Sequence, residues 1–138
     1  MSQENVDVVR ASIEAWNAGD MDAWGELLDS DAILRNPDGW PEPGPQMGRE
    51  AVVQQMLHVR DTWDANALEP ISDFVDVGDR VVVRLMWHGV GHGPDLHLEM
   101  TCLYTVRKRK IIGLELSWNH AEALEAVGLS EQDAHADS

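Results

Sequence analysis

Residues 79–120 read DRVVVRLMWHGVGHGPDLHLEMTCLYTVRKRKIIGLELSWNH. Three runs rich in β-branched, aromatic and other apolar residues occupy positions 81–87, 96–106 and 111–118. A Gly/Pro-rich loop separates the first two runs, and a short basic segment separates the last two. Strand-forming runs joined by short loops are typical of hairpins, so the sequence predicts a three-stranded antiparallel meander.

Side chains alternate between the two faces of a strand, which assigns a face to each residue of the meander. The predicted apolar face consists of Val81, Val83, Leu85, Trp87, Leu98, Met100, Cys102, Tyr104, Ile112, Leu114, Leu116 and Trp118. The opposite face is more polar and includes Arg84, His88, His97 and Glu99. A sheet with one apolar face needs a cover, which we expect the N-terminal half of the chain to provide.

That N-terminal half shows helical spacing. Apolar residues recur at helical intervals in residues 4–18, and Asp20 is placed to cap a second, shorter helix. A third helix is predicted from residue 49 to about 63 and a closing one over 121–127, with strands over 32–36 and 67–77. The apolar residues of 67–77 do not alternate, so the face of that strand stays open.

Composition excludes several classes of function. The chain has 138 residues, enough for one domain with a modest core, and its formal net charge is −15. This charge opposes binding to nucleic acid or to anionic membranes. The sequence has no apolar run long enough for a membrane span, and its single cysteine, Cys102, cannot form an internal disulfide bond. Both features indicate a cytoplasmic protein.

Several short motifs carry a resemblance to a known family. They are AWNAGDMDAW at 15–24, NPDG at 36–39, MGREAV at 47–52, YTVR at 104–107 and AEALEAVGL at 121–129. In this order they resemble the SnoaL-like and ketosteroid-isomerase-like proteins of the nuclear transport factor 2-like superfamily. The resemblance covers one domain, residues 1–129, and leaves 130–138 as a flexible acidic tail.

The resemblance implies a cone-shaped α+β fold, in which a curved antiparallel sheet wraps around N-terminal helices and encloses a central apolar pocket. The residues expected to line this ligand pocket are Trp16, Leu34, Asn36, Trp40, Leu85, Trp87, Met100, Cys102, Leu116 and Trp118. Residues 40–47, rich in proline and glycine, form either a lid over the pocket or a rigid connection.

The catalytic groups of ketosteroid isomerase are absent from the matching positions. The resemblance places that family's base directly before a proline, where this chain has Asn36, and an amide does not take up a proton. The tyrosine position falls near Ser12, and the position of the neutral acid falls on Cys102 or Thr101. The sequence therefore argues against steroid isomerisation.

Two catalytic candidates remain. Asp38 lies two residues beyond the expected base position, where a role in the turn is the favoured interpretation. Tyr104 lies on the predicted apolar face, where packing is the favoured role and hydrogen bonding to a ligand carbonyl the alternative.

Histidines and basic residues complete the candidate sites. A symmetric loop between the first two meander strands makes His88 and His97 cross-strand neighbours. Two facing imidazoles with a carboxylate from Asp95 or Glu99 could hold zinc or copper. No metal motif of fixed spacing is present, however, so we expect no metal and no cofactor, and interpret the two histidines as an exposed or dimer-facing pair. The segment RKRK at 107–110 is expected to be a solvated hairpin tip, wider than a glycine-containing turn.

These observations favour a protein that binds a small apolar molecule and lacks the ketosteroid isomerase groups, with catalysis left open. The alternative is an enzyme of polyketide-like or steroid-like ring chemistry that transfers protons through Asp38 or Tyr104. A structural subunit is a third interpretation. We also expect a homodimer formed through the polar sheet face, which contains the apolar residues Val82, Met86 and Leu103.

Overall fold

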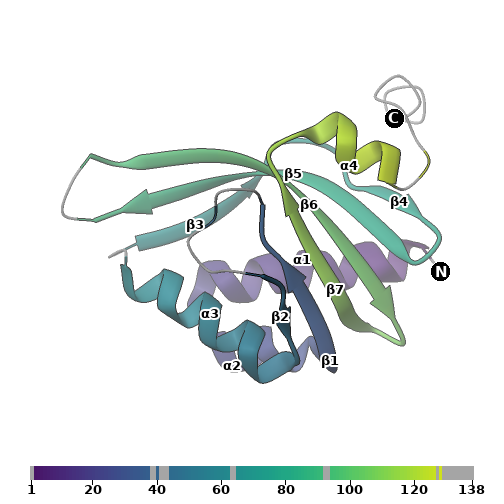
Figure 1. Cartoon of the computed structure of the whole chain (residues 1–138), viewed down its shortest axis with the longest axis horizontal. Helices are drawn as coiled ribbons and strands as arrows, with labels where there is room; N and C mark the ends of the chain where they lie inside the picture. Colours follow the sequence, from purple (N-terminus) through teal and green to yellow (C-terminus); the bar gives the residue numbers. More distant parts are fainter. Residues whose placement is uncertain are drawn as a thin grey trace.

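Three helices cover one face of a single curved sheet, and a fourth helix covers part of the other. The computed structural model describes residues 2–37, 40, 44–62, 65–91, 94–126 and 128. Helices α1 (Ser2–Ala18), α2 (Met21–Glu26) and α3 (Arg49–Thr62) lie on one side, and α4 (His120–Ala126) packs against strands on the other (Figure 1). No helix in these ranges is both long and apolar enough to cross a bilayer. The predicted α+β class is confirmed.

The strands form one sheet in the order β2 (Gln46–Met47), β1 (Leu28–Arg35), β7 (Lys110–Ser117), β6 (Leu96–Arg107), β5 (Arg80–Val90) and β3 (Ala65–Pro70). A short strand, β4 (Val75–Val77), also pairs with β5. The antiparallel β5–β6–β7 meander is confirmed. The pairing of β1 with β7 is parallel, so the sheet is mixed at that junction.

The junction between α1 and α2 orients two tryptophans that matter for the site. Gly19 has a φ of 74°, and the amides of Gly19 and Asp20 bond back to carbonyls of the last turn of α1. The Asp20 side chain then accepts a hydrogen bond from the Ala23 amide and caps α2. As a result Trp16 and Trp24 meet edge to face, with ring centroids 6.2 Å apart.

Most of the predicted apolar face of the meander is buried, whereas Leu98, Ile112 and Leu116 are partly buried and Trp118 is exposed. Val81, Val83 and Leu85 are all fully buried against the helices. In β7 the core position belongs to Ile111, and the predicted Ile112 is only partly buried. The pairing shifts between Val106↔Ile111 and Thr105↔Gly113, and this bulge reverses the alternation.

The predicted strand over 67–77 is two strands. Pro70 pairs with Leu85, and Val75 pairs with Val82. Between these two pairs the chain advances five positions on the 67–77 segment but only three on β5. The Ile71 amide still reaches the Arg84 carbonyl at 2.9 Å. The two additional residues explain why no single alternation fitted the segment.

The apolar residues predicted to face a dimer partner are largely covered within the chain. Val82 and Leu103 are buried and pack with Ala123 and Leu124 of α4. Thr101 is buried too, and its hydroxyl lies 3.2 Å from Nδ1 of His120. The burial of these residues therefore requires no second chain, which corrects one premise of the predicted dimer.

The hairpin between β6 and β7 is tight, so the expectation of a wide turn is wrong. Lys108 and Arg109 form a two-residue turn with φ angles of 51° and 64°. Residues with a β-carbon pay about 1–2 kcal/mol in this left-handed region. Because Asn-Gly suits such a turn, the double variant Lys108→Asn/Arg109→Gly is expected to raise the free energy of unfolding by roughly 1 kcal/mol in urea denaturation.

The matched control for this turn is Lys108→Ala/Arg109→Ala, which keeps both β-carbons and is expected to give no stabilisation. Both variants remove the exposed ion pair between Arg109 and Glu4, which contributes little. Equal stability of the two variants would contradict the role of backbone strain.

Candidate functional site

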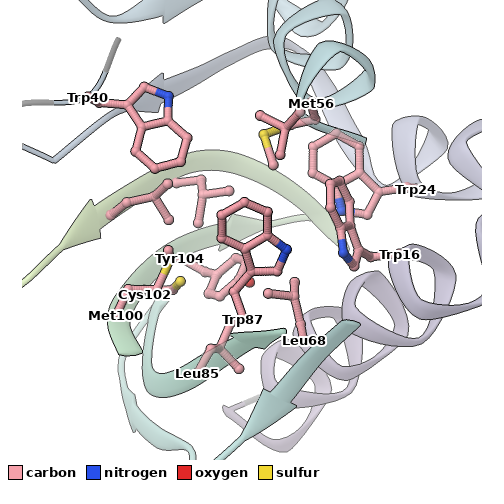
Figure 2. A pocket seen from close by; sticks show the side chains of 13 residues that line it. Trp16, Trp24, Trp40, Met56, Leu68, Leu85, Trp87, Met100, Cys102 and Tyr104 are labelled. Atoms are coloured by element: carbon pink, nitrogen blue, oxygen red, sulfur yellow. The ribbon is translucent and has the colours of Figure 1, made fainter. Parts of the chain in front are cut away.

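A small apolar cavity lies between the helices and the sheet. Its volume is about 50 Å³. The side chains around it are those of Trp16, Trp24, Trp40, Met56, Val59, Leu68, Leu85, Trp87, Met100, Cys102, Tyr104, Leu114 and Leu116 (Figure 2). Helices supply Trp16, Trp24 and Met56, and the curved meander supplies most of the opposite wall.

Part of this wall was not among the predicted pocket residues. The additional members are Trp24, Met56, Val59, Leu68 and Leu114. In the sequence they occupy ordinary core positions of helices and strands. Periodicity shows which side chains face inward, but it does not separate a side chain that borders a cavity from one that is packed on all sides.

Two indole nitrogens on the cavity wall have no hydrogen-bond partner. In the described part of the chain, only three buried side-chain nitrogen or oxygen atoms lack one: Nε1 of Trp16, Nε1 of Trp40 and Nε of Arg84. Trp16 is only 2% exposed. An N–H group buried without an acceptor costs about 1–3 kcal/mol, so these two tryptophans of the cavity wall each keep an unsatisfied donor.

Arg60 holds Trp16 from the helix side. Its Nη1 donates to the Trp16 carbonyl at 2.8 Å, and its guanidinium carbon lies 4.6 Å from the centroid of the indole ring. A cation at this distance from an aromatic face is attracted to it. The indole is therefore fixed both through its backbone and through its ring.

Trp40 borders the cavity from the connection after β1, and Trp118 packs beside it. Their ring centroids are 6.4 Å apart with planes inclined at 37°. Trp118 is 45% exposed, which corrects its predicted place in the pocket wall. The end of β7 turns its side chain outward, beside Trp40. Residues 41–43 of the predicted lid lie outside the described residues.

Two other predicted pocket residues lie elsewhere. Leu34 is fully buried in the core of the sheet and is absent from the cavity wall. Asn36 forms a reciprocal amide pair with Gln55 of α3: Nδ2 of Asn36 lies 3.1 Å from Oε1 of Gln55, and Nε2 of Gln55 lies 2.8 Å from Oδ1 of Asn36. This pair fastens the end of β1 to α3, so the Asn36 amide has a structural partner.

The titratable groups on the described wall are a phenol and a thiol. Burial raises the pKa of Cys102 to about 12, although its hydrogen bond with Tyr104 acts in the opposite direction. Burial, and next the neighbouring Cys102, raise the pKa of Tyr104 well above its usual value of 10.0, against a hydrogen bond with Ser12. Both groups are therefore neutral near pH 7. The Tyr104 hydroxyl is hydrogen-bonded to Ser12 and Cys102 and is unsuited to act as a base.

The raised pKa of Cys102 predicts a loss of stability at alkaline pH. Below pH 9 the thiol is protonated in both states, whereas between pH 9 and about 12 it ionises only in the unfolded chain. The free energy of unfolding contributed by Cys102 therefore falls as pH rises through this window, by about 2 kcal/mol at about pH 10.5. Urea denaturation from pH 8 to pH 10.5 measures the loss.

Cys102→Ala is the control for the alkaline loss. This variant lacks the thiol, so its stability is expected to decline less steeply over the same pH range. The comparison uses the slopes, because removing the thiol also alters packing. Identical slopes for the two proteins would show that Cys102 does not titrate as its burial requires.

Carboxylates and imidazoles are missing from the described wall of the cavity. Asp38, the predicted catalytic aspartate, lies outside the described residues. In the described ranges no group of three or more His, Cys, Asp or Glu side chains is arranged to hold a metal ion. On its described side the site consists of apolar surface that includes indole rings, together with one thiol and one phenol.

Solved structures show the same fold. Bal32a, from a soil-derived mobile gene cassette, superposes with a TM-score of 0.76 at 21% identity over 83% of this chain and 88% of its own. TerC, co-crystallised with polyporic acid, gives 0.74 at 21% identity over 90% and 97% of the two chains. A protein with a ketosteroid isomerase-like fold from Catenulispora acidiphila, in complex with trimethylamine, gives 0.70 at 18% identity over 88% and 92%.

Identities this low establish the fold alone. No curated protein matches the chain in sequence. The model of the SnoaL-like domain family, however, matches residues 9–114, which include the second half of α1, all but one of the residues around the cavity and most of the meander. The chain belongs to the SnoaL-like domain family.

Proposed function

We propose that this protein binds a small, planar, largely apolar molecule that carries a hydrogen-bond acceptor such as a carbonyl oxygen. The observation that carries the proposal is the pair of unpartnered, buried indole N–H groups on Trp16 and Trp40, two tryptophans whose rings line an otherwise apolar cavity. A ligand reaches these groups only when the rings move. Apolar walls with a few directed polar groups are typical of small-molecule sites. An acceptor on the ligand would satisfy an N–H group that is otherwise buried at a cost.

The volume of the cavity shows that a ring compound requires a side chain to move. An engineered cavity of about 150 Å³ binds benzene, whereas this one measures about 50 Å³. Trp40 is the side chain best placed to move, because it extends from an irregular connection and is only half-buried. Its displacement would merge the cavity with the space that the indole now fills (Figure 2).

The test begins with native mass spectrometry of freshly purified protein, which detects a co-purifying compound. Two probes, 1-indanone and indane, then share a fused bicyclic skeleton and differ by one carbonyl group. Their dissociation constants are measured for the native protein and for Trp16→Phe by ligand-observed NMR. One net hydrogen bond contributes about 1 kcal/mol. In Trp16→Phe the dissociation constant of 1-indanone, relative to that of indane, is therefore expected to rise about fivefold.

Leu116→Ala is the matched control, since it alters the cavity wall without removing an N–H group. It is expected to change the binding of both probes alike and to leave their ratio unchanged. Absence of binding of either probe at millimolar concentration, together with no co-purified compound, would refute the binding function. Binding with an unchanged ratio in Trp16→Phe would refute the role of the indole N–H group.

A second function, proton transfer on a ring compound, is favoured by the Tyr104 phenol in the cavity wall. A neutral phenol can donate a hydrogen bond to a ketone while a base removes a neighbouring proton, a role left to Asp38. Proton transfer is tested by NMR, which follows the exchange for deuterium of the hydrogens on the carbon next to the carbonyl of 1-indanone. Exchange faster than in buffer, lost in both Tyr104→Phe and Asp38→Asn, would establish catalysis; exchange at the buffer rate would leave binding alone.

We also propose a homodimer that forms through the part of the outer sheet face that α4 leaves uncovered. Met86 is partly exposed there, and Arg84 and Glu99 form an ion pair beside it. Met86→Glu would add a carboxylate to a contact between identical surfaces and is expected to shift the protein towards monomer. Sedimentation at micromolar concentration measures this, and a native mass near 15.4 kDa would contradict the dimer.

A further inference from the structure

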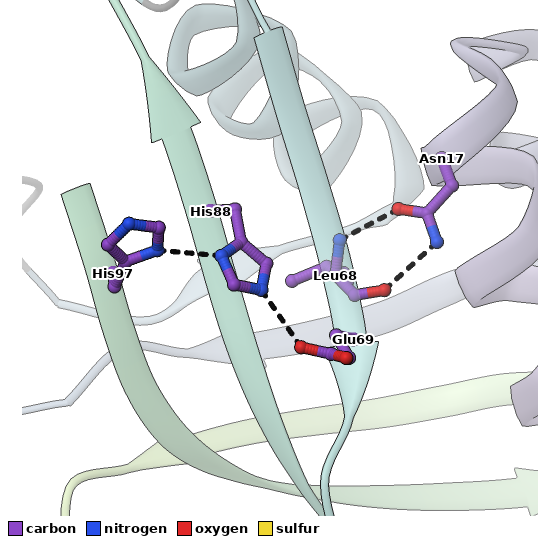
Figure 3. Close-up of polar contacts among 5 residues, drawn as sticks. All are labelled: Asn17, Leu68, Glu69, His88 and His97. Carbon is purple, nitrogen blue, oxygen red and sulfur yellow. Dashed lines mark hydrogen bonds and ion pairs between the residues drawn. The ribbon is translucent and has the colours of Figure 1, made fainter. Parts of the chain in front are cut away.

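We propose that His88 and His97 form a binding site for a divalent transition-metal ion of square-planar preference, Cu²⁺ above all. The two residues are cross-strand partners in the β5–β6 register. Their Nδ1 atoms lie 2.7 Å apart, and the ring planes are inclined at 75° (Figure 3). In the single chain His88 has 34% of its side chain exposed and His97 is exposed, so an ion from solvent can reach the pair when no second copy covers this end of the outer sheet face.

Glu69 on β3 sets the tautomer of His88. Its Oε1 lies 3.0 Å from Nε2 of His88, and a carboxylate only accepts hydrogen bonds, so this nitrogen carries the hydrogen. In the neutral imidazole the lone pair is then on Nδ1, the atom that faces His97. A carboxylate behind a histidine is the usual second-sphere arrangement of metal-binding histidines.

The position of Glu69 is itself fixed by the neighbouring residue of β3. The side chain of Asn17 donates to the Leu68 carbonyl at 2.9 Å and accepts from the Leu68 amide at 2.7 Å (Figure 3). These two bonds tie β3 to the end of α1. Glu69 is thereby held beside His88 by the fold and not only by its own rotamer.

The spacing of the two nitrogens favours one coordination geometry. Bonds of about 2.0 Å place neighbouring ligands of a square-planar ion about 2.8 Å apart and those of a tetrahedral ion about 3.3 Å apart. The observed 2.7 Å is the length of the hydrogen bond between the two nitrogens, so a square-planar ion requires less separation of the rings than a tetrahedral ion does. Cu²⁺ prefers this geometry and also binds nitrogen most strongly among the divalent first-row ions.

Without metal, Nδ1 of His97 carries a hydrogen and donates it to Nδ1 of His88. Metal binding requires that hydrogen to move to Nε2 of His97 and both rings to tilt until the lone pairs converge. The torsion next to an imidazole ring is broad, and the exposure of both rings leaves room for the tilt. No third His, Cys, Asp or Glu of the described residues converges on the pair, so water would complete the coordination. The net charge of −15 attracts the cation.

The test is a titration of the untagged, chelator-treated chain with Cu²⁺, followed by calorimetry and by electron paramagnetic resonance. We expect one ion per chain, two coordinated nitrogens in the spectrum and affinity in the order Cu²⁺, Ni²⁺, Zn²⁺. Glu69→Gln is expected to weaken Cu²⁺ binding about 10- to 100-fold. His88→Gln and His97→Gln are each expected to remove the two-nitrogen signal.

His58→Gln is the matched control, because His58 is an exposed histidine on α3 and is expected to leave binding unchanged. Circular dichroism checks that each variant is folded. Cu²⁺ binding that persists in both His88→Gln and His97→Gln would overturn the site. The proposed site would also be overturned if His92→Gln, and neither His88→Gln nor His97→Gln, abolished Cu²⁺ binding. A stoichiometry of one ion per two chains in the titration would overturn it as well.

Discussion

Turnover of a Δ5-3-ketosteroid by this protein is expected to be at least about 10²–10⁴-fold slower than by a ketosteroid isomerase, because a positioned general base contributes that factor. The base position holds Asn36, whose amide is paired with Gln55 and is absent from the cavity wall. The two positions matching the neutral acid hold Thr101 and Cys102. A spectrophotometric assay of the conversion of the non-conjugated Δ5-3-ketone into the conjugated Δ4-3-ketone measures the rate, and turnover within about tenfold of a known isomerase would contradict the assignment.

Asn36→Asp sharpens the same prediction. The sequence alone suggests that a carboxylate at this position would restore some activity. In the structure that carboxylate would replace the amide that faces Gln55, away from the cavity, so no gain is expected. A rate increase of tenfold or more in Asn36→Asp would show that the side chain reaches a bound steroid and that the amide pair opens.

Removing one partner of the Asn36–Gln55 pair is expected to lower the free energy of unfolding more than replacing both partners. Gln55 is only 6% exposed, so Asn36→Leu leaves its amide without a partner, at a cost of about 1–3 kcal/mol. Gln55→Leu likewise leaves the half-buried Asn36 amide without its hydrogen-bond partner. Chemical denaturation of each variant measures these losses.

The double variant Asn36→Leu/Gln55→Leu is the decisive comparison. Replacing both partners by apolar groups of similar shape is often nearly neutral, so the double variant is expected to lose less than the sum of the single losses. The interaction energy from this cycle is expected to be about 1 kcal/mol or more. Strictly additive losses would mean that the two amides do not depend on each other for hydrogen bonding.

The sequence by itself determined the meander, its buried face and the missing isomerase groups. Val81, Val83 and Leu85 alternate in the sequence and are buried in the structure, because side-chain alternation is a property of each strand. The Asp20 cap and the Gly19 helix end are likewise local, since each bonds within a few residues. The cross-strand pairing of His88 and His97 followed from the symmetry of one hairpin.

Only the tertiary structure decided what lies between segments distant in the chain. Gln55 meets Asn36, and Glu69 meets His88, because helix packing and sheet order bring α3 to β1 and β3 to β5. The bulge that places Ile111, and not Ile112, in the core depends on the register between β6 and β7. The sequence of one strand does not specify that register. Strand periodicity assigns a face to a side chain, whereas the partner on that face is set by the packing of the whole domain.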